Sequence, residues 1–267
     1  MPMVMKPMYR FEKMDGLGND FMLLDADCQD KTCTLPPTAQ AIRRWSDRRR
    51  GIGFDQLIYL YKQQDTQYYQ FFNADGSPAE QCGNGQRAIA LYLKNKQLAM
   101  PITIEGAGGP VQLNHQDDDH ITVSFTQTYQ YEKKQLSLLG MPVTAYLVDV
   151  GNPHCIILSA DVEGEALAEK AALISAYFDS GINVEMMQII SDHHVRVRVY
   201  ERGAGETLAC GSGAAAVAIV LRHYFKGQQD IKVSMPGGDL QVLLSAECDK
   251  ISLIGPARSV YQGQIYD

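Results

Sequence analysis

Two stretches of this chain decide its fold: FNADGSPAEQCGNG, residues 72–85, and YERGAGETLACGSG, residues 200–213. Each begins with an aromatic residue, has a polar residue nine positions before a cysteine, and ends in Cys-Gly-x-Gly. The two cysteines, Cys82 and Cys210, are 128 residues apart. Further matched segments follow in the same order at offsets of 129 and 130 residues, the glycine pairs at 108–109 and 237–238 among them. Self-similarity in register indicates a duplicated pair of similar domains.

The residues around these stretches predict the same coarse elements in both copies. Residues 195–199 alternate valine and arginine, the pattern of a half-buried strand, and residues 68–72 form a weaker counterpart. After each Cys-Gly-x-Gly the chain is apolar on every side, over 88–93 and over 214–221, which predicts a helix buried at the centre of its domain. The glycine pairs then mark turns between flanking strands.

These elements predict an α+β fold. We expect two pseudo-symmetric domains from an internal duplication, each a mixed, mainly antiparallel sheet wrapped around a central buried helix. Pro36 and Pro37 predict the start of a further helix that continues through Trp45.

Charge and composition exclude several classes of function. Lys and Arg total 24 against 31 Asp and Glu, a net charge of −7 that argues against a nucleic-acid partner. We interpret the basic run Arg43-Arg44 and Arg48-Arg49-Arg50 as a solvated helix face. The longest small and apolar stretch, 209–221, is shorter than the roughly 20 residues of a membrane span. Six cysteines are too few for a disulfide framework, so we expect a reducing, cytoplasmic setting.

Cys82 and Cys210 stand where the two buried helices are expected to begin. Unpaired backbone N–H groups and the helix dipole give this end partial positive charge, which lowers a thiol pKa and attracts a carboxylate. The glycines that follow let a ligand approach the backbone closely. With the two domains facing each other, a thiolate and a thiol can lie on opposite sides of one α-carbon. Racemisation or epimerisation by general acid–base catalysis needs this arrangement.

The remaining cysteines do not stand in a repeated, glycine-rich stretch of this kind. We interpret Cys28, Cys33 and Cys248 as structural residues. Cys155 follows His154 directly, which is the wrong spacing for a pair of zinc ligands, so the sequence predicts no metal site.

Six segments together carry a resemblance to a known family. The chain resembles the diaminopimelate epimerase family, in family order along nearly its whole length, through KMDGLGNDF (13–21), GIGFDQ (51–56), FNADGS (72–77), QCGNG (81–85), GNPHC (151–155) and YERGAGET with CGSG (200–207 and 210–213). The resemblance implies a cofactor-independent epimerase that converts L,L-2,6-diaminopimelate to meso-diaminopimelate, for lysine and peptidoglycan precursor synthesis. Its active site is then expected in a cleft between residues 1–126, completed by 257–267, and residues 127–256.

The resemblance also implies roles for individual residues. Cys82 and Cys210 are the implied acid/base pair, and His154 and Glu201 are implied to tune the thiol pKa values. The residues implied in substrate binding are Asn19, Gln56, Asn73, Gly83, Asn84, Asn152, Asn183, Glu201, Arg202, Gly211 and Ser212. The family is a homodimer, and Tyr261 matches a tyrosine at its interface. Asp15 departs from the histidine that the family often has and adds a negative charge near the implied Asn19.

Other classes of protein fit the sequence less well. A pyridoxal-phosphate racemase needs a Schiff-base lysine, and no lysine here lies in an apolar setting. The glycine motifs lack the third glycine of a dinucleotide site, and no Gly-Lys-Ser/Thr occurs. A thiol redox protein is the strongest rival from another class, although Cys-x-x-Cys is absent. A racemase of another amino acid on the same fold, for example histidine, stays open, but Glu201-Arg202-Gly203 favours a substrate with a second carboxylate.

Overall fold

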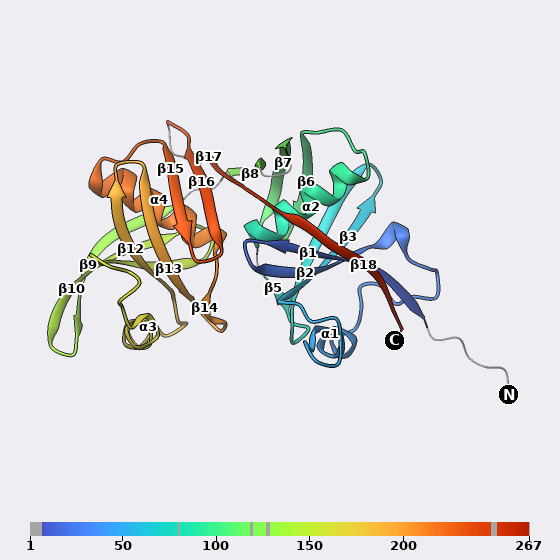
Figure 1. Ribbon diagram of the computed structural model, residues 1–267, viewed down its shortest axis with the longest axis horizontal. Helices are drawn as coiled ribbons and strands as arrows, with labels where there is room; N and C mark the ends of the chain where they lie inside the picture. Colours follow the sequence, from blue (N-terminus) through green and yellow to red (C-terminus); the bar gives the residue numbers. More distant parts are fainter. Residues whose placement is uncertain (1–6, 80, 118–119, 127–128, 247–249, 267) are drawn as a thin grey trace. The chain divides into compact units, whose positions relative to one another are not determined.

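The computed structural model describes residues 7–79, 81–117, 120–126, 129–246 and 250–266, so Cys248 lies outside the described residues. The chain divides into two compact units, Met1–Ile121 with Pro256–Asp267, and Thr122–Gly255. The division falls inside strand β8 (His120–Thr126), a few residues before the boundary expected from the sequence. Figure 1 shows each unit as a sheet with a long helix against its strands, which confirms the α+β class.

The first unit is a sheet of mixed direction. Its helices and strands are η1 (Ala26–Cys28), α1 (Ala39–Ser46), α2 (Gly83–Asn95), β1 (Met8–Gly16), β2 (Asn19–Asp25), β3 (Gln56–Gln63), β4 (Thr66–Asn73), β5 (Pro78–Ala79), β6 (Ile102–Gly106), β7 (Gly109–Asp117) and β18 (Arg258–Tyr266). Strand β1 is antiparallel to β18 and β2, while β2–β3 and β4–β6 are parallel pairs. The pairs β3–β4, β4–β5 and β6–β7 are antiparallel. The red strand β18 thus lies beside the blue strand β1 (Figure 1).

The second unit repeats this order. Its helices and strands are α3 (Leu167–Ser175), α4 (Gly211–Phe225), β9 (Gln130–Leu138), β10 (Met141–Asp149), β11 (Pro153–Leu158), β12 (Asn183–Ser191), β13 (His194–Glu201), β14 (Gly205–Thr207), β15 (Asp230–Met235), β16 (Gly238–Leu244) and β17 (Lys250–Gly255). The parallel pairs are β11–β12 and β13–β15, and the pairs β9–β10, β10–β11, β12–β13, β13–β14, β15–β16 and β16–β17 are antiparallel. Parallel and antiparallel pairs therefore follow the same sequence in both units, which confirms the predicted duplication.

Helices α2 and α4 are the predicted central helices. All residues from Asn84 to Leu93 are buried in α2, and all from Gly213 to Leu221 are buried in α4. In each unit a second helix packs on the sheet: α1 buries Ile42 and Trp45 in one core, and α3 buries residues of its apolar face in the other. Both cysteines of the repeat are N-caps, Cys82 of α2 and Cys210 of α4, in extended backbone conformation.

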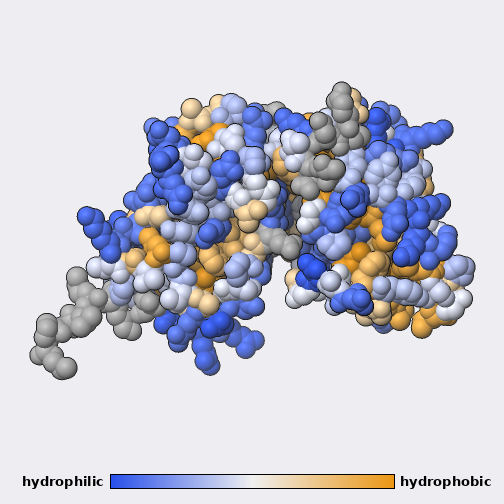
Figure 2. All heavy atoms as spheres, turned by 180° about the vertical axis from the view of Figure 1, so that it is seen from behind, coloured by the Kyte–Doolittle hydropathy of each residue, from blue (hydrophilic) through white to orange (hydrophobic). Residues whose placement is uncertain are grey.

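The face of each unit that Figure 2 shows carries many hydrophilic side chains, with hydrophobic side chains gathered in patches. One such patch coincides with the hairpin β9–β10, where Leu139 and Met141 are exposed. Within the described ranges, every helix is too short or too polar to span a membrane.

Helix α1 begins later than the sequence predicts. It starts at Ala39, not at Pro36, because Thr38 is its N-cap and accepts a hydrogen bond from the amide of Ala41 over 3.2 Å. Thr38 has extended backbone angles, and a threonine oxygen satisfies one of the amides that a helix leaves unpaired at its first turn. A proline pair is a weaker start signal than a capping side chain two residues further on.

Replacing Thr38 by alanine is expected to lower the free energy of unfolding of the first unit by about 1 kcal/mol, because the Ala41 amide loses its acceptor. Trp45 is the only tryptophan of the chain and is fully buried in this unit, so its fluorescence in a denaturant titration reports the change. Thr38→Ser keeps the acceptor and should stay close to the parent protein. Equal losses in both variants would contradict the capping role.

Candidate active site

The first group of candidate residues lies where α2 begins. The Cys82 thiol donates a hydrogen bond to Oδ1 of Asn19 over 3.4 Å. Asn19 is the first residue of β2, and the turn before it is closed by Asp15, whose carboxylate accepts a hydrogen bond from the amide of Gly18 (3.0 Å). Gly18 has a φ of +82°, a conformation that glycine adopts at no steric cost. Asp15 thus shapes the hairpin that presents Asn19 to the thiol.

A charged cluster holds Asn19 in place. Its amide donates to Oδ2 of Asp55 (3.0 Å), and Arg48 joins Asp55 to Asp20 through contacts of 2.6 and 2.8 Å. Asp20 also accepts a hydrogen bond from Nζ of Lys13 (2.5 Å). Burial opposes the charge of Asp20, but the hydrogen bonds from Arg48 and Lys13 outweigh it and hold the pKa of this carboxyl group well below its ordinary value. Arg48 is exposed, as predicted for the basic run, but it follows the end of α1 at Ser46 and takes part in this ion-pair cluster.

Gln56 and Asn73 form a second polar pair in this unit. They are register partners on β3 and β4, and Nε2 of Gln56 donates to Oδ1 of Asn73 over 3.4 Å. The Asn73 amide donates in turn to Oγ of Ser77 (3.1 Å). Oε1 of Gln56 is buried and has no hydrogen-bond partner among the described residues. A buried acceptor of this kind is suited to a donor on a ligand.

Asn84 and Gly83 contact a buried arginine that the sequence analysis passed over. Arg87, one turn further along α2, is fully buried and donates to Oδ1 of Asn84 (2.7 Å) and to the carbonyl of Gly83 (3.4 Å). It also donates to the carbonyl of Pro256 (3.1 Å). Burial lowers the pKa of Arg87 to about 10. Arg87 thus fixes the first turn of α2, which carries Cys82.

In the second unit, Cys210 begins a chain of hydrogen bonds. Its sulfur accepts a hydrogen bond from the amide of Gly213 (3.4 Å) and lies 3.3 Å from Oγ of Ser212. The Asn152 amide donates to that hydroxyl (3.3 Å), and Oδ1 of Asn152 lies 3.2 Å from Nε2 of His154. Four of the residues implied by the sequence are therefore connected, and Gly211 is the first residue of α4 beside them.

Asn183, Glu201 and Arg202 lie at the ends of the neighbouring strands. Oδ1 of Asn183 accepts a hydrogen bond from the amide of Arg202 (2.9 Å), and its Nδ2 donates to the carbonyl of Pro153 (3.1 Å). Glu201 accepts hydrogen bonds from Thr207 and from the Cys210 thiol. Burial raises the pKa of the Glu201 carboxyl group. Each unit therefore brings its own share of the candidate residues together around its own cysteine.

The sequence predicts a lowered thiol pKa at both helix ends, and at Cys210 this prediction is wrong. Burial raises the pKa of the Cys210 thiol well above its ordinary value, and the charges of Glu201 and Glu185 raise it further. Hydrogen bonds from Ser212 and Gly213 act in the opposite direction and are outweighed. Desolvation and two carboxylates thus exceed the effect of the hydrogen bonds that the thiol receives at this helix end.

Alkylation of Cys210 by iodoacetamide is expected to speed up with pH through a midpoint above about 8.5, the ordinary thiol value, because only the thiolate reacts. Peptide mass spectrometry on the reduced full chain follows Cys210 separately from the other cysteines. Glu201→Gln should move the midpoint to lower pH, because one negative charge beside the sulfur is removed. Glu206→Gln, at an exposed carboxylate, should leave it in place. A midpoint below about 8.5 in the parent protein would contradict the expectation.

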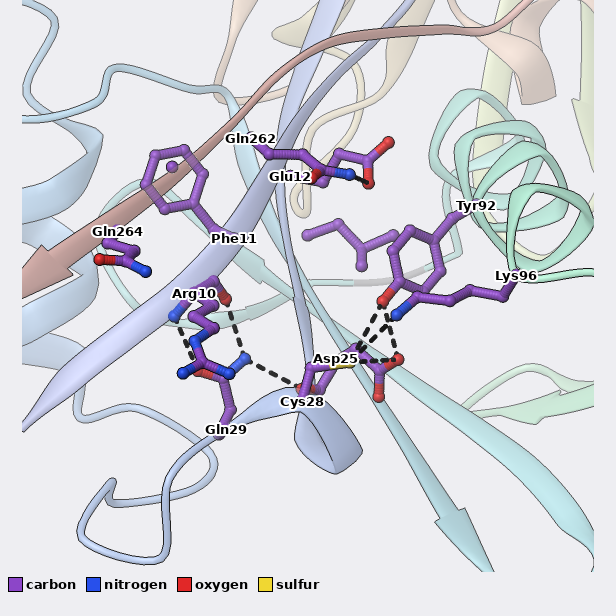
Figure 3. A pocket seen from close by; sticks show the side chains of 12 residues that line it. Arg10, Phe11, Glu12, Asp25, Cys28, Gln29, Tyr92, Lys96, Gln262 and Gln264 are labelled. Atoms are coloured by element: carbon purple, nitrogen blue, oxygen red, sulfur yellow. Dashed lines mark hydrogen bonds between the residues drawn. The ribbon is translucent and has the colours of Figure 1, made fainter.

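A separate cavity of about 620 Å³ lies in the first unit (Figure 3). Tyr92 and Lys96, from the C-terminal end of α2, line it, so it is at the opposite end of this helix from Cys82. Cys28 lies here too, with its sulfur 3.2 Å from Nζ of Lys96 and 3.5 Å from a carboxylate oxygen of Asp25. The described residues that line the cavity include none of the predicted catalytic or substrate-binding residues. The cavity is therefore distinct from the candidate site.

The family of the chain is found by comparison with known protein families. The chain matches the family model described as diaminopimelate epimerase over residues 11–130 and 146–260. The two ranges cover most of the chain and contain one copy of the duplication each. The fold and the paired cysteine sites define a duplicated α+β protein of the epimerase type, and the chain belongs to the diaminopimelate epimerase family.

Solved structures share this fold at low sequence identity. A phenazine biosynthesis protein of the PhzF family from Enterococcus faecalis has a TM-score of 0.71 and 15% identity, covering 97% of this chain and 100% of that one. A hydroxyproline epimerase from Agrobacterium vitis with bound trans-4-hydroxy-L-proline has a TM-score of 0.72 and 14% identity, covering 98% and 94%. A probable proline racemase from Agrobacterium radiobacter K84 has a TM-score of 0.70 and 14% identity, covering 96% and 92%.

Proposed function

We propose that this protein is an isomerase that epimerises L,L-2,6-diaminopimelate to meso-diaminopimelate without a cofactor. The observation that carries the proposal is the pair of cysteines at matched N-caps of the two central helices, in a chain whose two halves both match the family model. The hydroxyproline epimerase and the probable proline racemase of the same fold, by their names, also invert a stereocentre of an amino acid.

In the proposed reaction the two thiols act on one α-carbon. One cysteine, as thiolate, removes the α-proton, and the other, as thiol, returns a proton to the opposite side. Burial and carboxylates favour the protonated form of Cys210, which suits this thiol to donate a proton. The reaction requires that one substrate reaches both cysteines.

The polar residues around the cysteines suit a diamino dicarboxylate. Backbone amides of the first turns, at Gly83-Asn84 and Gly211-Ser212, can bind the α-carboxylate, because a helix N-terminus favours an anion. Arg202 can bind the distal carboxylate through its guanidinium group. Glu201 and the amide side chains can accept hydrogen bonds from the ammonium groups. The amide side chains proposed for this role are those of Asn19, Gln56, Asn73, Asn152 and Asn183.

Proton NMR of L,L-diaminopimelate with the reduced protein in D2O tests the proposal. Deuterium from solvent entering the α-position, together with meso product, would establish a two-base epimerase. Absence of exchange with fully reduced thiols would refute the diaminopimelate assignment. The same assay on histidine, glutamate and other amino acids would then distinguish a racemase for a different amino acid from a protein without this chemistry.

We further propose that the protein works as a homodimer in a reducing, cytoplasmic setting, where its thiols stay reduced. Tyr261 on β18 is exposed, and its ring lies edge-on to that of Phe11 with 5.8 Å between centroids. An exposed aromatic residue of this kind is typical of an interface. Sedimentation analysis should give a dimer for the parent protein and a monomer-enriched distribution for Tyr261→Ala. A parent protein that sediments as a monomer would refute the dimer.

A further inference from the structure

Glu185 is a charged residue that the reaction proposed above does not use. It is the third residue of β12, and its side chain is fully buried. Its register partners are Ile156 on β11 and Val199 on β13, so both neighbouring strands place apolar residues beside it. A carboxylate is costly to remove from water unless it is paired. Its presence in the middle of the sheet therefore calls for a partner.

That partner is His154, which is also fully buried. Its Nδ1 lies 2.6 Å from Oε1 of Glu185, and its Nε2 lies 3.2 Å from Oδ1 of Asn152. The Asn152 amide is oriented so that its nitrogen donates to Ser212 and its oxygen faces the ring. Each ring nitrogen thus faces an oxygen acceptor, and only the doubly protonated imidazolium has a hydrogen for both.

Glu185 also lies against the first turn of α4. A Cβ atom at Gly213 would stand 2.7 Å from Oε1 of Glu185, while the amide of Gly213 donates to the sulfur of Cys210. Glycine at this position therefore lets the turn that carries Cys210 approach the carboxylate. The partial positive charge at the N-terminal end of α4 attracts the Glu185 carboxylate. Oε2 of Glu185 has no hydrogen-bond partner among the described residues.

The titratable groups around His154 lie on several elements, whereas β10 places the apolar Val148 opposite it. They are Glu185 on β12, Glu201 at the end of β13, Cys210 before α4, and Cys155 on its own strand. Burial, and then the charge of Glu185, raise the pKa of Cys155 to about 12, so this thiol is neutral. Of these four groups, the Glu185 carboxyl group is the one that contacts Nδ1 of the ring, so a proton on His154 balances its charge.

We propose that Glu185 is the counter-ion that keeps His154 doubly protonated, and that the chain from Glu185 through His154, Asn152 and Ser212 positions the Cys210 thiol. Glu185 acts on the sulfur through its charge and through these neighbours, so it is a positioning residue. The inference rests on the proposed function for the role of Cys210, whereas the charge state of His154 requires no substrate.

Nitrogen-15 NMR of the reduced full chain, labelled at histidine, tests the proposal. The two ring nitrogens give similar shifts in an imidazolium and widely separated shifts in a neutral ring, and His154→Asn identifies which signals belong to His154. We expect His154 to be doubly protonated in the parent protein near pH 7, because each ring nitrogen faces an oxygen acceptor. In Glu185→Gln, whose amide oxygen still accepts from Nδ1, we expect the doubly protonated signature to be lost at the same pH. Glu163→Gln, at an exposed carboxylate of the same unit, should retain it.

A neutral His154 ring in the parent protein near pH 7 would overturn the proposal, and that measurement needs no variant to fold. So would a doubly protonated His154 that persists in Glu185→Gln at the same pH. If the protein epimerises no amino acid but His154 is doubly protonated only when Glu185 is present, the proposed function fails and the counter-ion inference stands. If epimerisation occurs and the ring is neutral, the reverse holds.

Discussion

Replacing Cys82 or Cys210 by serine is expected to lower the rate of diaminopimelate epimerisation by about 10²- to 10⁴-fold, the usual contribution of a positioned acid or base. A serine hydroxyl has nearly the same shape as the thiol but releases its proton far less readily. The measurement is the initial rate of meso product formation by reduced protein, together with deuterium incorporation at the α-carbon. Both single variants should be affected, since each direction of the reaction uses both thiols.

Cys33→Ser is the matched control for these variants. Cys33 is half-buried in the first unit, and its thiol donates to the carbonyl of Met8 (3.3 Å), away from every candidate residue. The Cys33→Ser variant should retain epimerase activity to within about threefold of the parent protein, because a substitution near the surface usually changes stability little. Activity in Cys82→Ser or Cys210→Ser equal to that of Cys33→Ser would remove that cysteine from the mechanism.

Asp20→Asn is expected to lower the free energy of unfolding of the first unit by about 2–3 kcal/mol, between the values typical of surface and of buried ion pairs. Asparagine keeps the shape of the side chain but leaves Lys13 buried without its carboxylate and removes the bidentate contact to Arg48. Trp45 fluorescence during urea unfolding follows this unit. Because the same cluster orients Asn19 against the Cys82 thiol, the variant should also lose epimerase activity.

The pH dependence of this loss has a definite sign. The pKa of Asp20 is depressed in the folded state, so its stabilisation is complete above the unfolded value of about 3.9 and is lost as the pH falls towards the folded value. The stability difference between the parent protein and Asp20→Asn should therefore be constant above about pH 5 and shrink below about pH 4. Asp65→Asn is the control, because its pair with Lys62 is exposed and 3.9 Å long, and it should cost less than about 0.5 kcal/mol. A loss equal to that of Asp65→Asn would show that the Asp20 cluster is not stabilising.

The duplication made the fold predictable from the sequence. Two Cys-Gly-x-Gly stretches followed by apolar runs indicated two central helices, because a run such as Ala214–Leu221 has no polar face to leave in water. The start of α1 was not predictable from Pro36, since the decisive contact is the Thr38 hydroxyl on the Ala41 amide. Local propensity and capping competed there, and capping set the boundary.

The candidate site was only partly accessible to sequence reasoning. Motif residues such as Cys82 and Asn19 are neighbours in space, as the resemblance implies, and a hydrogen bond joins them. Residues such as Glu185 and Arg48 carry no motif, and their roles depend on which strands and turns fold onto them. The thiol pKa of Cys210 was mispredicted for the same reason, because desolvation is a property of the packed unit and not of the helix end.

The first unit needs strand β18, which is translated after the second unit. This strand pairs along β1 from Met8↔Tyr266 to Asp15↔Arg258, so β1 waits for a strand that is translated after the whole second unit. The second unit, Thr122–Gly255, is continuous and can fold while β1 still has an open edge. During this interval the unpaired backbone groups of β1 are available to other chains. A ribosome that stalls before residue 258 would therefore release a chain with one finished unit and one aggregation-prone edge.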